Sequence, residues 1–391
     1  MYIAYIMNMS IGIQGFTYRE MEYLRKKDAK VCIYYTEYGI GPYMPEDKYD
    51  IFYYNYFSVL LNQISLLVKR PRLYLNLILE SIRSKTLSLF LLSVCFSEDM
   101  NNRGIEKIHC TFGGDKLLIG YYCKRILDLK LSVTVHAYEL KDTVIHTSHS
   151  KYNFSRRAYM SCNRIITISN WNKRQLIEKY LLPCNKISVI KLCSLVDKSV
   201  IDSRSSLELS VDDKSSFKVL IVGNSFERKG HEILLRAIDT LRSKNIRLWI
   251  VSQGGPIDLN SKIKEMNLQD SVRFFGSVSH SKLLEIYRNC DVYCLPAMFT
   301  ADGDHEGIPV SIMDAMAFSK PVISTKHTGI PELVEDILIE EKDVEGLAAE
   351  ILRLSRDKSL CISLGKRNKQ IIKTKFSEAN IRHFYEEVVC S

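Results

Sequence analysis

Short runs of apolar residues recur along the chain, and most of them are followed by a longer segment with helical spacing of its apolar positions. The runs lie at 2–8, 31–35, 105–110, 131–135, 164–168, 186–190, 217–222, 247–251, 272–275, 291–295 and 322–324. The helical segments lie at 16–26, 116–127, 170–180, 231–241, 281–290, 344–354, 358–373 and 378–389. Apolar runs of about four to eight residues are typical of buried parallel strands, and the helices between them of crossover connections. The pattern therefore predicts an α/β protein built on parallel sheets.

A polar segment rich in serine and charge separates the two sets of elements. It covers residues 199–216, and its composition is typical of a linker. A chain of 391 residues is also too long for one comfortable core. We therefore predict two domains, one at 1–198 and one at 217–373, followed by a last helical segment at 374–391.

Composition and charge narrow the class of protein. A hydrophobic share of 46% and a charged share of 25% are those of a soluble globular protein. Basic minus acidic residues in 1–200 gives 28 − 17 = +11, whereas the whole chain carries +9, so residues 201–391 carry −2. The positive charge belongs to the first half, which predicts an anionic partner there, either a membrane surface or a phosphorylated acceptor. No nucleic-acid partner is expected.

The cysteines indicate a reducing compartment. Eleven are scattered without a pairing rhythm, and the closest pair, Cys290 and Cys294, has no second pair to complete a zinc site. The N-terminus shows neither a basic n-region nor a cleavage site, so we expect no secretory signal. Reduced thiols in the cytoplasm are the simpler interpretation.

Residues 56–96 are unusually rich in leucine and interrupted by basic residues. Apolar stretches surround Lys69-Arg70-Pro71-Arg72 and the pair Arg83 and Lys85. No stretch reaches the roughly 18–20 residues of a membrane-spanning helix. Two interpretations stay open: a pair of helices packed on the sheet, or an interfacial patch whose leucines enter lipid while its arginines meet headgroups.

The most informative stretch is EGIPVSIMDAMA, Glu306 to Ala317. Gly307-Ile308-Pro309 predicts a tight turn into a helix, with the proline in its first turn. Because eight residues make just over two helical turns, Glu306 and Asp314 can face one elongated ligand. The helix start between them favours a phosphate. This order of groups suits a sugar nucleotide, which has hydroxyls at both ends and a diphosphate between.

This stretch resembles the E-x7-E signature of retaining glycosyltransferase family 4, the glycosyl transferases group 1. The wording from 301 to 334, ADGDHEGIPVSIMDAMAFSKPVISTKHTGIPELV, is similar to the branch that builds bacterial exopolysaccharides, colanic acid and O-antigens. The resemblance is densest from 217 to 335. The chain differs from the family at one position, where it has Asp314 and the family usually has glutamate. Because the aspartate side chain is shorter, its contact with the ligand can be water-mediated instead of direct.

The resemblance implies the GT-B fold, two Rossmann-like domains facing a central cleft. Residues 1–198 would bind the acceptor, 217–373 the sugar-nucleotide donor, and 374–391 would pack back on the N-terminal domain. The implied reaction moves a hexose, with retention, from a UDP- or GDP-linked donor to a glycan acceptor. A lipid-linked oligosaccharide in bacterial surface polysaccharide biosynthesis is the expected acceptor, at or near the cytoplasmic face of the inner membrane.

The loop from Gly223 to Gly230 is expected to grip the donor diphosphate. It fits neither G-x-G-x-x-G nor a Walker A loop, which argues against nicotinamide and ATP. By the resemblance, Lys229 occupies the position of the lysine that is usual in the family. Asn224 occupies the position of a common arginine, and Arg228 would take over the role of that arginine. Two cations can bind a diphosphate by charge-assisted bonds and stabilise it as a leaving group without a metal.

Other positions follow from the same resemblance. Glu306 would hold donor-sugar hydroxyls and Asp314 the ribose. The remaining expected donor contacts are Gly15, Gly223, Asn224, Ser277, Val278, Gly307, Ile308, Pro309 and Val310, with Ser277 and Val278 near the base. His136 lies just beyond an apolar run, where parallel sheets bind ligands, and it would contact the donor sugar or acceptor. The expected catalytic set is thus His136, Glu306, Arg228 and Lys229.

Two points stay open. Asp302 and Asp304 form a D-x-D that can chelate a cation beside a diphosphate, but GT-B members generally need no metal, so we expect neither a metal nor another cofactor. Two other functions stay in view. One is a GT-B-fold sugar-nucleotide epimerase, which would use the same nucleotide site without an acceptor. The other, in view of Asp314 and Asn224, is a non-catalytic sugar-nucleotide-binding protein.

Overall fold

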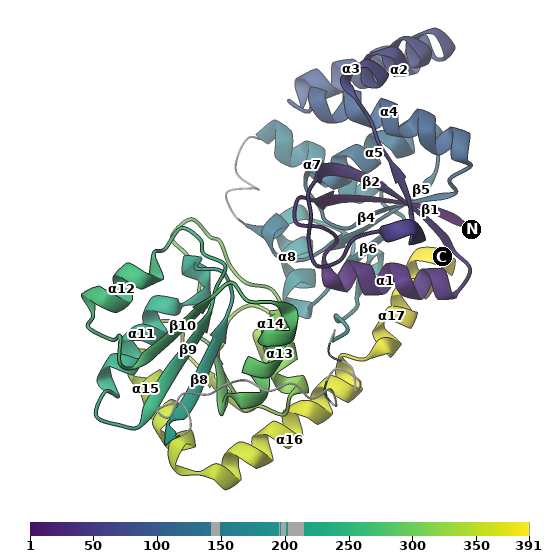
Figure 1. The fold of residues 1–391 in the computed structure, drawn as a ribbon. Coiled ribbons are helices and arrows are strands. Elements are labelled where there is room, and N and C mark those ends of the chain that lie inside the picture. Colours follow the sequence, from purple (N-terminus) through teal and green to yellow (C-terminus); the bar gives the residue numbers. More distant parts are fainter. Residues whose placement is uncertain (142–148, 195, 197–200, 202–214, 391) are drawn as a thin grey trace. The chain divides into compact units, whose positions relative to one another are not determined.

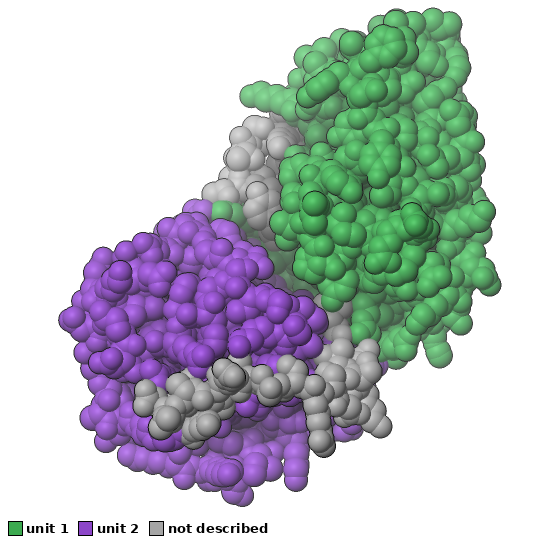
Figure 2. Space-filling view, in the orientation of Figure 1, with its two compact units in different colours: residues 1–193, 378–391 green, residues 194–377 purple. Residues whose placement is uncertain are grey.

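The computed structural model describes residues 1–141, 149–194, 196, 201 and 215–390. They form two compact units, shown in different colours in Figure 2. Unit 1 comprises Met1–Cys193 together with Glu378–Ser391, and unit 2 comprises Ser194–Ser377. Most of the predicted linker at 199–216 lies outside the described residues.

Unit 1 is built on a seven-stranded parallel sheet of order β3-β2-β1-β4-β5-β6-β7. The strands are β1 Tyr2–Met9, β2 Lys30–Tyr38, β3 Asp50–Phe52, β4 Lys107–Cys110, β5 Lys130–Val135, β6 Arg164–Thr167 and β7 Ile187–Val189. Both faces of the central strands are buried, as expected for a parallel sheet. On β1, for example, Ala4 and Ile6 pack into one core, and Ile3 and Tyr5 into the core on the opposite face.

Helices cover both faces of this sheet (Figure 1). They are α1 Gly15–Lys26, α2 Tyr56–Lys69, α3 Pro71–Arg83, α4 Leu87–Arg103, α5 Asp115–Leu127, α7 His149–Ser161 and α8 Asn170–Tyr180. Phe90 of α4 and Tyr122 of α5 belong to the core that contains Ala4. Met21 and Leu24 of α1 belong to the core on the other face.

The last helix of the chain, α17 Glu378–Tyr385, lies beside α1 in unit 1 (Figure 1). A π-helical turn, Glu386–Cys390, follows it. Phe384, Val388 and Val389 are buried in the same core as Met21. Lys107 donates a hydrogen bond to the Val389 carbonyl at 2.5 Å, which ties the end of the chain to β4.

Unit 2 has a six-stranded parallel sheet of order β10-β9-β8-β11-β12-β13. The strands are β8 Phe217–Val222, β9 Ile246–Val251, β10 Val272–Gly276, β11 Val292–Leu295, β12 Val322–Thr325 and β13 Ile337–Ile339. The helices are α11 His231–Thr240, α12 Leu259–Glu265, α13 His280–Asn289, α14 Val310–Ala317, α15 Val344–Arg356 and α16 Lys358–Lys375. The two Rossmann-like sheets confirm the predicted α/β class. None of the helices in the described ranges is both long and apolar enough to span a membrane.

Candidate functional site

The candidate site of unit 2 lies where the strand order reverses. β8 has β9 on one side and β11 on the other, so the loops after β8 and β11 start at neighbouring carboxyl ends. Open α/β sheets bind ligands at such a switch point. The first loop is Gly223–Gly230 and the second contains Glu306, which explains how residues far apart in sequence reach one place.

Gly230 shapes the first loop. Its backbone is left-handed, with φ of 72°, and a Cβ there would lie 2.0 Å from the carbonyl oxygen of Pro296. Only glycine can adopt this φ angle and lie this close to Pro296 without strain. The chain can therefore turn from the short 3-10 helix Glu227–Lys229 directly into α11 while lying against the segment after β11. This places Arg228 and Lys229 beside Glu306.

Arg228, Lys229 and Glu306 form one charged cluster. Arg228 Nε donates to Glu306 Oε1 at 2.7 Å, and Lys229 Nζ donates to Glu306 Oε2 at 2.9 Å. A second donor of Arg228, Nη1, binds Asp304 Oδ2 at 2.7 Å, and the guanidinium lies 4.5 Å from the centre of the Phe226 ring. Both carboxylate oxygens of Glu306 are thus held by cations. The cluster brings two of the predicted diphosphate residues to the predicted sugar residue.

A second layer fixes the Glu306 backbone. The Glu306 N–H donates to His327 Nε2 at 3.2 Å, and Thr328 Oγ1 donates to the Glu306 carbonyl at 2.7 Å. His327 Nδ1 lies 2.6 Å from Glu341 Oε1. Since Nε2 accepts, the proton of the neutral ring sits on Nδ1 and is donated to Glu341. This chain from Glu341 through His327 holds the Glu306 backbone in place.

The charges of the cluster follow from its surroundings. Burial alone would raise the pKa of Glu306, but Lys229 and Arg228 outweigh it and hold the pKa below its ordinary value. Burial likewise acts to lower the pKa of Arg228, but Glu306 and Asp304 raise it above the usual range. Burial lowers the pKa of His327, against the opposing effect of Glu341. Glu306 is therefore a carboxylate and His327 a neutral ring near neutral pH.

Asp314 lies on α14, apart from these salt bridges. It is partly buried, and its Oδ1 is enclosed without a hydrogen-bond partner among the described residues. Burial raises the pKa of Asp314 to about 7. Pro309 proves to be the residue that caps α14 rather than part of its first turn, which begins at Val310. A buried carboxyl group with an unused acceptor is a candidate ligand contact.

The other expected donor residues of unit 2 lie at the same edge of the sheet. Ser277 is exposed and Val278 partly buried, directly after β10, and Asn224 is exposed in the loop after β8. Gly307 and Val310 are partly exposed, while Ile308 and Pro309 are buried. Gly223 adjoins the Lys229 side chain, whose Cε would lie 3.2 Å from a Cβ at Gly223.

The acidic loop before Glu306 does not gather metal ligands. Asp304 is paired with Arg228, and Asp302 Oδ1 accepts from Thr300 Oγ1 at 2.5 Å. In the described part of the chain, no group of three or more His, Cys, Asp or Glu side chains is placed to hold a metal ion. Independence of metal stays a prediction.

In unit 1, His136 follows β5 directly, as the sequence predicts. Its ring contacts the rings of Phe16 and Phe112, with 4.6 Å between the ring centres in each case. Burial lowers the pKa of His136 to about 4, so the ring is neutral. Glu139 accepts a hydrogen bond from the His136 N–H at 3.3 Å. The buried Nε2 has no hydrogen-bond partner within the described ranges.

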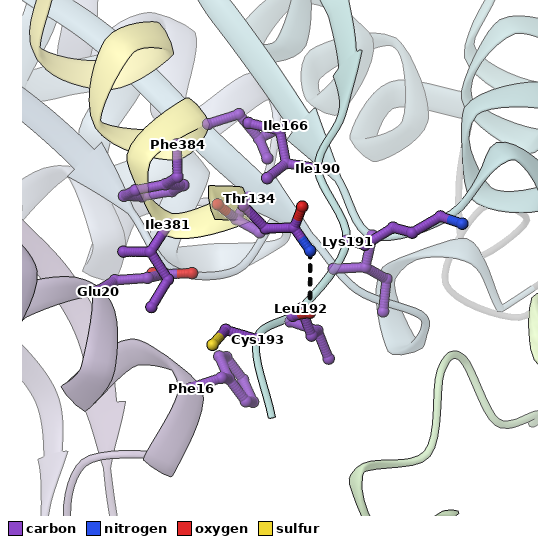
Figure 3. Close-up of a pocket in the computed structure, with 12 residues that line it drawn as sticks. Phe16, Glu20, Thr134, Ile166, Ile190, Lys191, Leu192, Cys193, Ile381 and Phe384 are labelled. Carbon is purple, nitrogen blue, oxygen red and sulfur yellow. Dashed lines mark hydrogen bonds between the residues drawn. The ribbon is translucent and has the colours of Figure 1, made fainter. Parts of the chain in front are cut away.

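A narrow crevice opens in unit 1 next to Phe16 (Figure 3). It is bounded by α1, α17 and the segment after β7, and Asn380 Nδ2 donates to the Leu192 carbonyl at 3.4 Å across it. Glu20 of α1 is the acidic residue in its lining. Gly15 is the first residue of α1. A Cβ at Gly12 would come within 2.7 Å of the Tyr43 carbonyl oxygen, so a contact inside the chain accounts for the glycine at this position.

Several residues around the cluster escaped the sequence analysis. His327, Thr328 and Glu341 support Glu306, and Phe226 lies against Arg228. Nothing in the sequence distinguishes His327 from a surface histidine. Asp304 was considered only as a metal ligand, and the structure shows it as a partner of Arg228.

The fold and this site define a GT-B protein. Its described residues resemble a solved structure of Alr3699/HepE from Anabaena in complex with UDP, with a TM-score of 0.72 and 17% identity over 100% of both chains. They also resemble WaaG, described as a glycosyltransferase involved in lipopolysaccharide biosynthesis, with a TM-score of 0.67 and 12% identity over 100% of both chains. At these identities the likeness concerns the fold.

Residues 216–357 match the family model of the glycosyl transferases group 1, which confirms the predicted resemblance over most of unit 2. Residues of the chain are 30% identical to the amylovoran biosynthesis glycosyltransferase AmsK of Erwinia amylovora, over 50% of this chain and 48% of that protein. They are 34% identical to the putative colanic acid biosynthesis glycosyltransferase WcaL of Salmonella typhimurium, over 36% of each. The chain thus spans half or less of these curated relatives. Their names and the family match support the predicted enzyme class, glycosyltransferase.

Proposed function

We propose that this protein is a retaining glycosyltransferase that moves a hexose from a nucleoside-diphosphate sugar to a glycan acceptor. The observation that carries the proposal is the cluster of Arg228, Lys229 and Glu306 at the switch point of unit 2. It combines two cations for a diphosphate with a carboxylate for sugar hydroxyls. The family match covers the same residues.

The chemistry of the cations supports a diphosphate leaving group. A guanidinium has five N–H donors, and Glu306 and Asp304 engage the Nε and Nη1 donors of Arg228. Lys229 adds a compact ammonium beside it. Both would stabilise the negative charge that develops as the glycosidic bond to the diphosphate breaks, the role that a metal has at other sites. Glu306, held as a carboxylate, would accept hydrogen bonds from sugar hydroxyls and so orient the sugar.

The rest of the donor is assigned along α14 and the neighbouring strand ends. Asp314, with its unused buried oxygen, would accept from the ribose hydroxyls. The start of α14 favours phosphate oxygens, and the segment at Ser277 and Val278 would meet the base. Because the HepE structure is described with UDP, and another with UDP and glucose, uridine diphosphate is the first donor nucleotide to test.

The acceptor is proposed from the names of the relatives. Amylovoran and colanic acid are the products named there, so a glycan of bacterial surface polysaccharide biosynthesis, carried on a lipid, is the proposed acceptor class. His136, a neutral ring with an enclosed unpartnered Nε2, is the proposed contact of unit 1 to donor sugar or acceptor. The cysteines of the described residues are thiols and form no disulfide, which fits a cytoplasmic location.

The test is incubation with a panel of nucleotide sugars and a lipid-diphosphate acceptor, followed by mass spectrometry and by NMR of the anomeric proton. A new glycoside with the donor's anomeric configuration supports the proposal. A glycoside with the inverted configuration would contradict the retaining mechanism. An isomerised donor without a glycoside supports an epimerase. Binding without any reaction supports a non-catalytic protein. The same assay with EDTA tests metal independence, and loss of activity restored by manganese would contradict it.

A further inference from the structure

Large apolar side chains on α2 face solvent. In relative exposure, Tyr56 reaches 92%, Phe57 70%, Leu60 63%, Leu61 49%, Ile64 60%, Leu67 39% and Val68 74%. Their spacing of one, three and four residues places them on one side of the helix. α2 thus carries a continuous apolar stripe on its outer side, over most of its length. Scattered exposed apolar residues are ordinary in proteins, but a continuous stripe marks an interaction surface.

The inner side of α2 is only partly apolar. Leu66 is buried in the core. Gln63 is buried, and its Nε2 donates to the carbonyls of Val59 at 2.8 Å and Leu91 at 3.0 Å. Asn62 Nδ2 donates to Cys95 Sγ of α4 at 3.4 Å. A helix in a water-soluble protein normally turns its apolar side to the core and its polar side to water. α2 instead has its larger apolar side in water, which indicates that this outer side is made for an apolar environment.

The neighbouring helix α3 extends the surface and adds charge. Tyr74, Leu77 and Ser81 are buried, while Leu75, Leu79 and Ile82 are 53%, 51% and 56% exposed. Arg72 near the start and Arg83 at the end are exposed on the same spacing, and Lys85 follows. Figure 1 shows α2 and α3 next to each other at an end of unit 1, with α4 between them and the sheet.

The charge of this region is one-sided. Residues 56–88 contain five basic residues, Lys69, Arg70, Arg72, Arg83 and Lys85, and one acidic residue, Glu80. Glu80 already pairs with Arg157 at 2.5 Å and lies 3.5 Å from Arg125. Lys69 pairs with Glu98 of α4 at 2.8 Å, so the net positive charge beside the apolar stripe comes from the other four basic residues.

We propose that α2 and α3 form a docking surface for an anionic lipid bilayer, with the apolar stripe of α2 entering the acyl boundary. Helices with exposed apolar stripes and flanking basic residues lie in the plane of such interfaces. Basic side chains at the surface add attraction to anionic headgroups, and Tyr56 is of the aromatic type enriched at membrane interfaces. A second copy of this chain fits less well, because a symmetric contact would bring the same cations together.

The proposal rests on α2 and α3 alone and does not depend on the donor site. The experiment is sedimentation of the full chain with vesicles of phosphatidylglycerol and phosphatidylethanolamine, compared with vesicles of phosphatidylcholine. The test variant is Ile64→Gln with Val68→Gln, which leaves the buried contacts of α2 untouched. The matched control is Leu181→Gln with Ile362→Gln, which alters two apolar side chains of similar exposure, 66% and 51%, away from α2 and α3.

We expect the wild type and the control to bind anionic vesicles alike, and the α2 variant to bind at least about tenfold more weakly, since two apolar side chains no longer leave water. A second variant, Arg72→Gln with Lys85→Gln, should weaken binding by about fivefold per charge. Raising the salt from about 0.1 M to about 1 M shortens the Debye length from about 10 Å to about 3 Å and should reduce binding.

Three results would overturn the proposal. One is a wild type that binds no vesicles, and another is an α2 variant that binds as well as its control. The third is a wild-type dimer that the α2 variant turns into a monomer without any vesicle binding, which would assign the stripe to a second copy. Circular dichroism and thermal melting of each variant show that it is folded.

Discussion

Arg228 and Lys229 place two positive charges on one carboxylate, and this arrangement gives the donor site its strongest test. Replacing Lys229 by alanine should weaken donor binding and lower turnover about ten- to a thousandfold, because a cation facing the developing charge is lost. Steady-state kinetics with the active donor measures this. The matched control is Lys244→Ala, an exposed lysine of the same unit. Wild-type kinetics in Lys229→Ala would refute the assignment.

Glu306 and Asp314 differ in surroundings and should differ in kinetic effect. Glu306 is clamped by two cations and is proposed to orient the reacting sugar, so Glu306→Gln should lower kcat and the selectivity for the donor sugar. Asp314 is proposed to hold the ribose, which does not react, so Asp314→Asn should mainly raise the KM for the donor. A hydrogen bond to a charged group such as the Glu306 carboxylate is worth about 1.5–3 kcal/mol, or about tenfold or more.

The same experiment includes a conservative control. Asp314→Glu restores the residue usual in the resembling family and should keep activity. Should Glu306→Gln retain full turnover while Asp314→Asn abolishes it at saturating donor, the two roles are reversed. The placement of the donor along α14 would then be wrong.

At the scale of elements, the contact between α1 and α17 contains an acid in a mostly apolar crevice (Figure 3). Burial raises the pKa of Glu20 to about 8, above its ordinary value of about 4.3. The folded state therefore prefers the protonated acid. Its contribution to stability is complete below about pH 4 and is lost as the pH rises toward about 8.

Glu20→Gln should remove this pH dependence. We expect the free energy of unfolding of the wild type to fall by about 1–2 kcal/mol relative to the variant between about pH 5 and 8, a value reduced for the partial exposure of Glu20. Denaturant titrations across this range measure it. Glu178→Gln, an exposed glutamate of α8, is the control and should follow the wild type. Parallel curves for the wild type and Glu20→Gln would contradict the prediction.

The positions of helices and strands were largely predictable, because a buried strand of about five or six residues leaves a clear apolar run in the sequence. The runs at 217–222 and 247–251 correspond to β8 and β9 within one residue. The strands that the pattern missed are β3 and β13, edge strands of three residues, too short for a periodicity. The outward stripe of α2 was also beyond the pattern, since the order of residues does not show which side of a helix meets α4.

The site was predictable in part for a related reason. Arg228 and Lys229 are adjacent in the sequence, so their loop was visible there. Their pairing with Glu306, 78 and 77 residues away, follows only from the adjacency of β8 and β11. The role of His327 is harder still to predict from the sequence, because it depends on a hydrogen bond from the backbone N–H of Glu306. Groups of functional residues that are adjacent in the sequence can be recognised there, but contacts between residues far apart in the sequence require the fold.

At the scale of the whole molecule, unit 1 is completed by the last residues of the chain. Ile381, Phe384, Val388 and Val389 are buried to 6% exposure or less. Each such side chain contributes about 1.5–3 kcal/mol, so the four together approach the total stability of a domain. A chain ending at Ser377 should therefore have an unfolded or aggregating unit 1 and a folded unit 2.

The two tryptophans separate these outcomes, because Trp171 lies in unit 1 and Trp249 in unit 2. Fluorescence melts of Trp171→Phe and Trp249→Phe forms report one unit each. A milder change, Phe384→Ala, should lower the stability of unit 1 by about 3–5 kcal/mol. Arg382→Ala, on the exposed side of the same helix, should have little effect. Equal melting of unit 1 with and without residues 378–391 would refute the prediction.

The return of the chain to unit 1 also sets an order for folding during synthesis. A ribosome produces all of unit 2 before it produces Phe384 and Val389, so the surface of unit 1 that receives them stays uncovered while unit 2 emerges. Unit 2 is continuous and can fold as soon as Ser377 has left the exit tunnel. Although its strands are made first, unit 1 is therefore completed after unit 2, and its uncovered apolar surface is open to aggregation until residues 378–391 have been made.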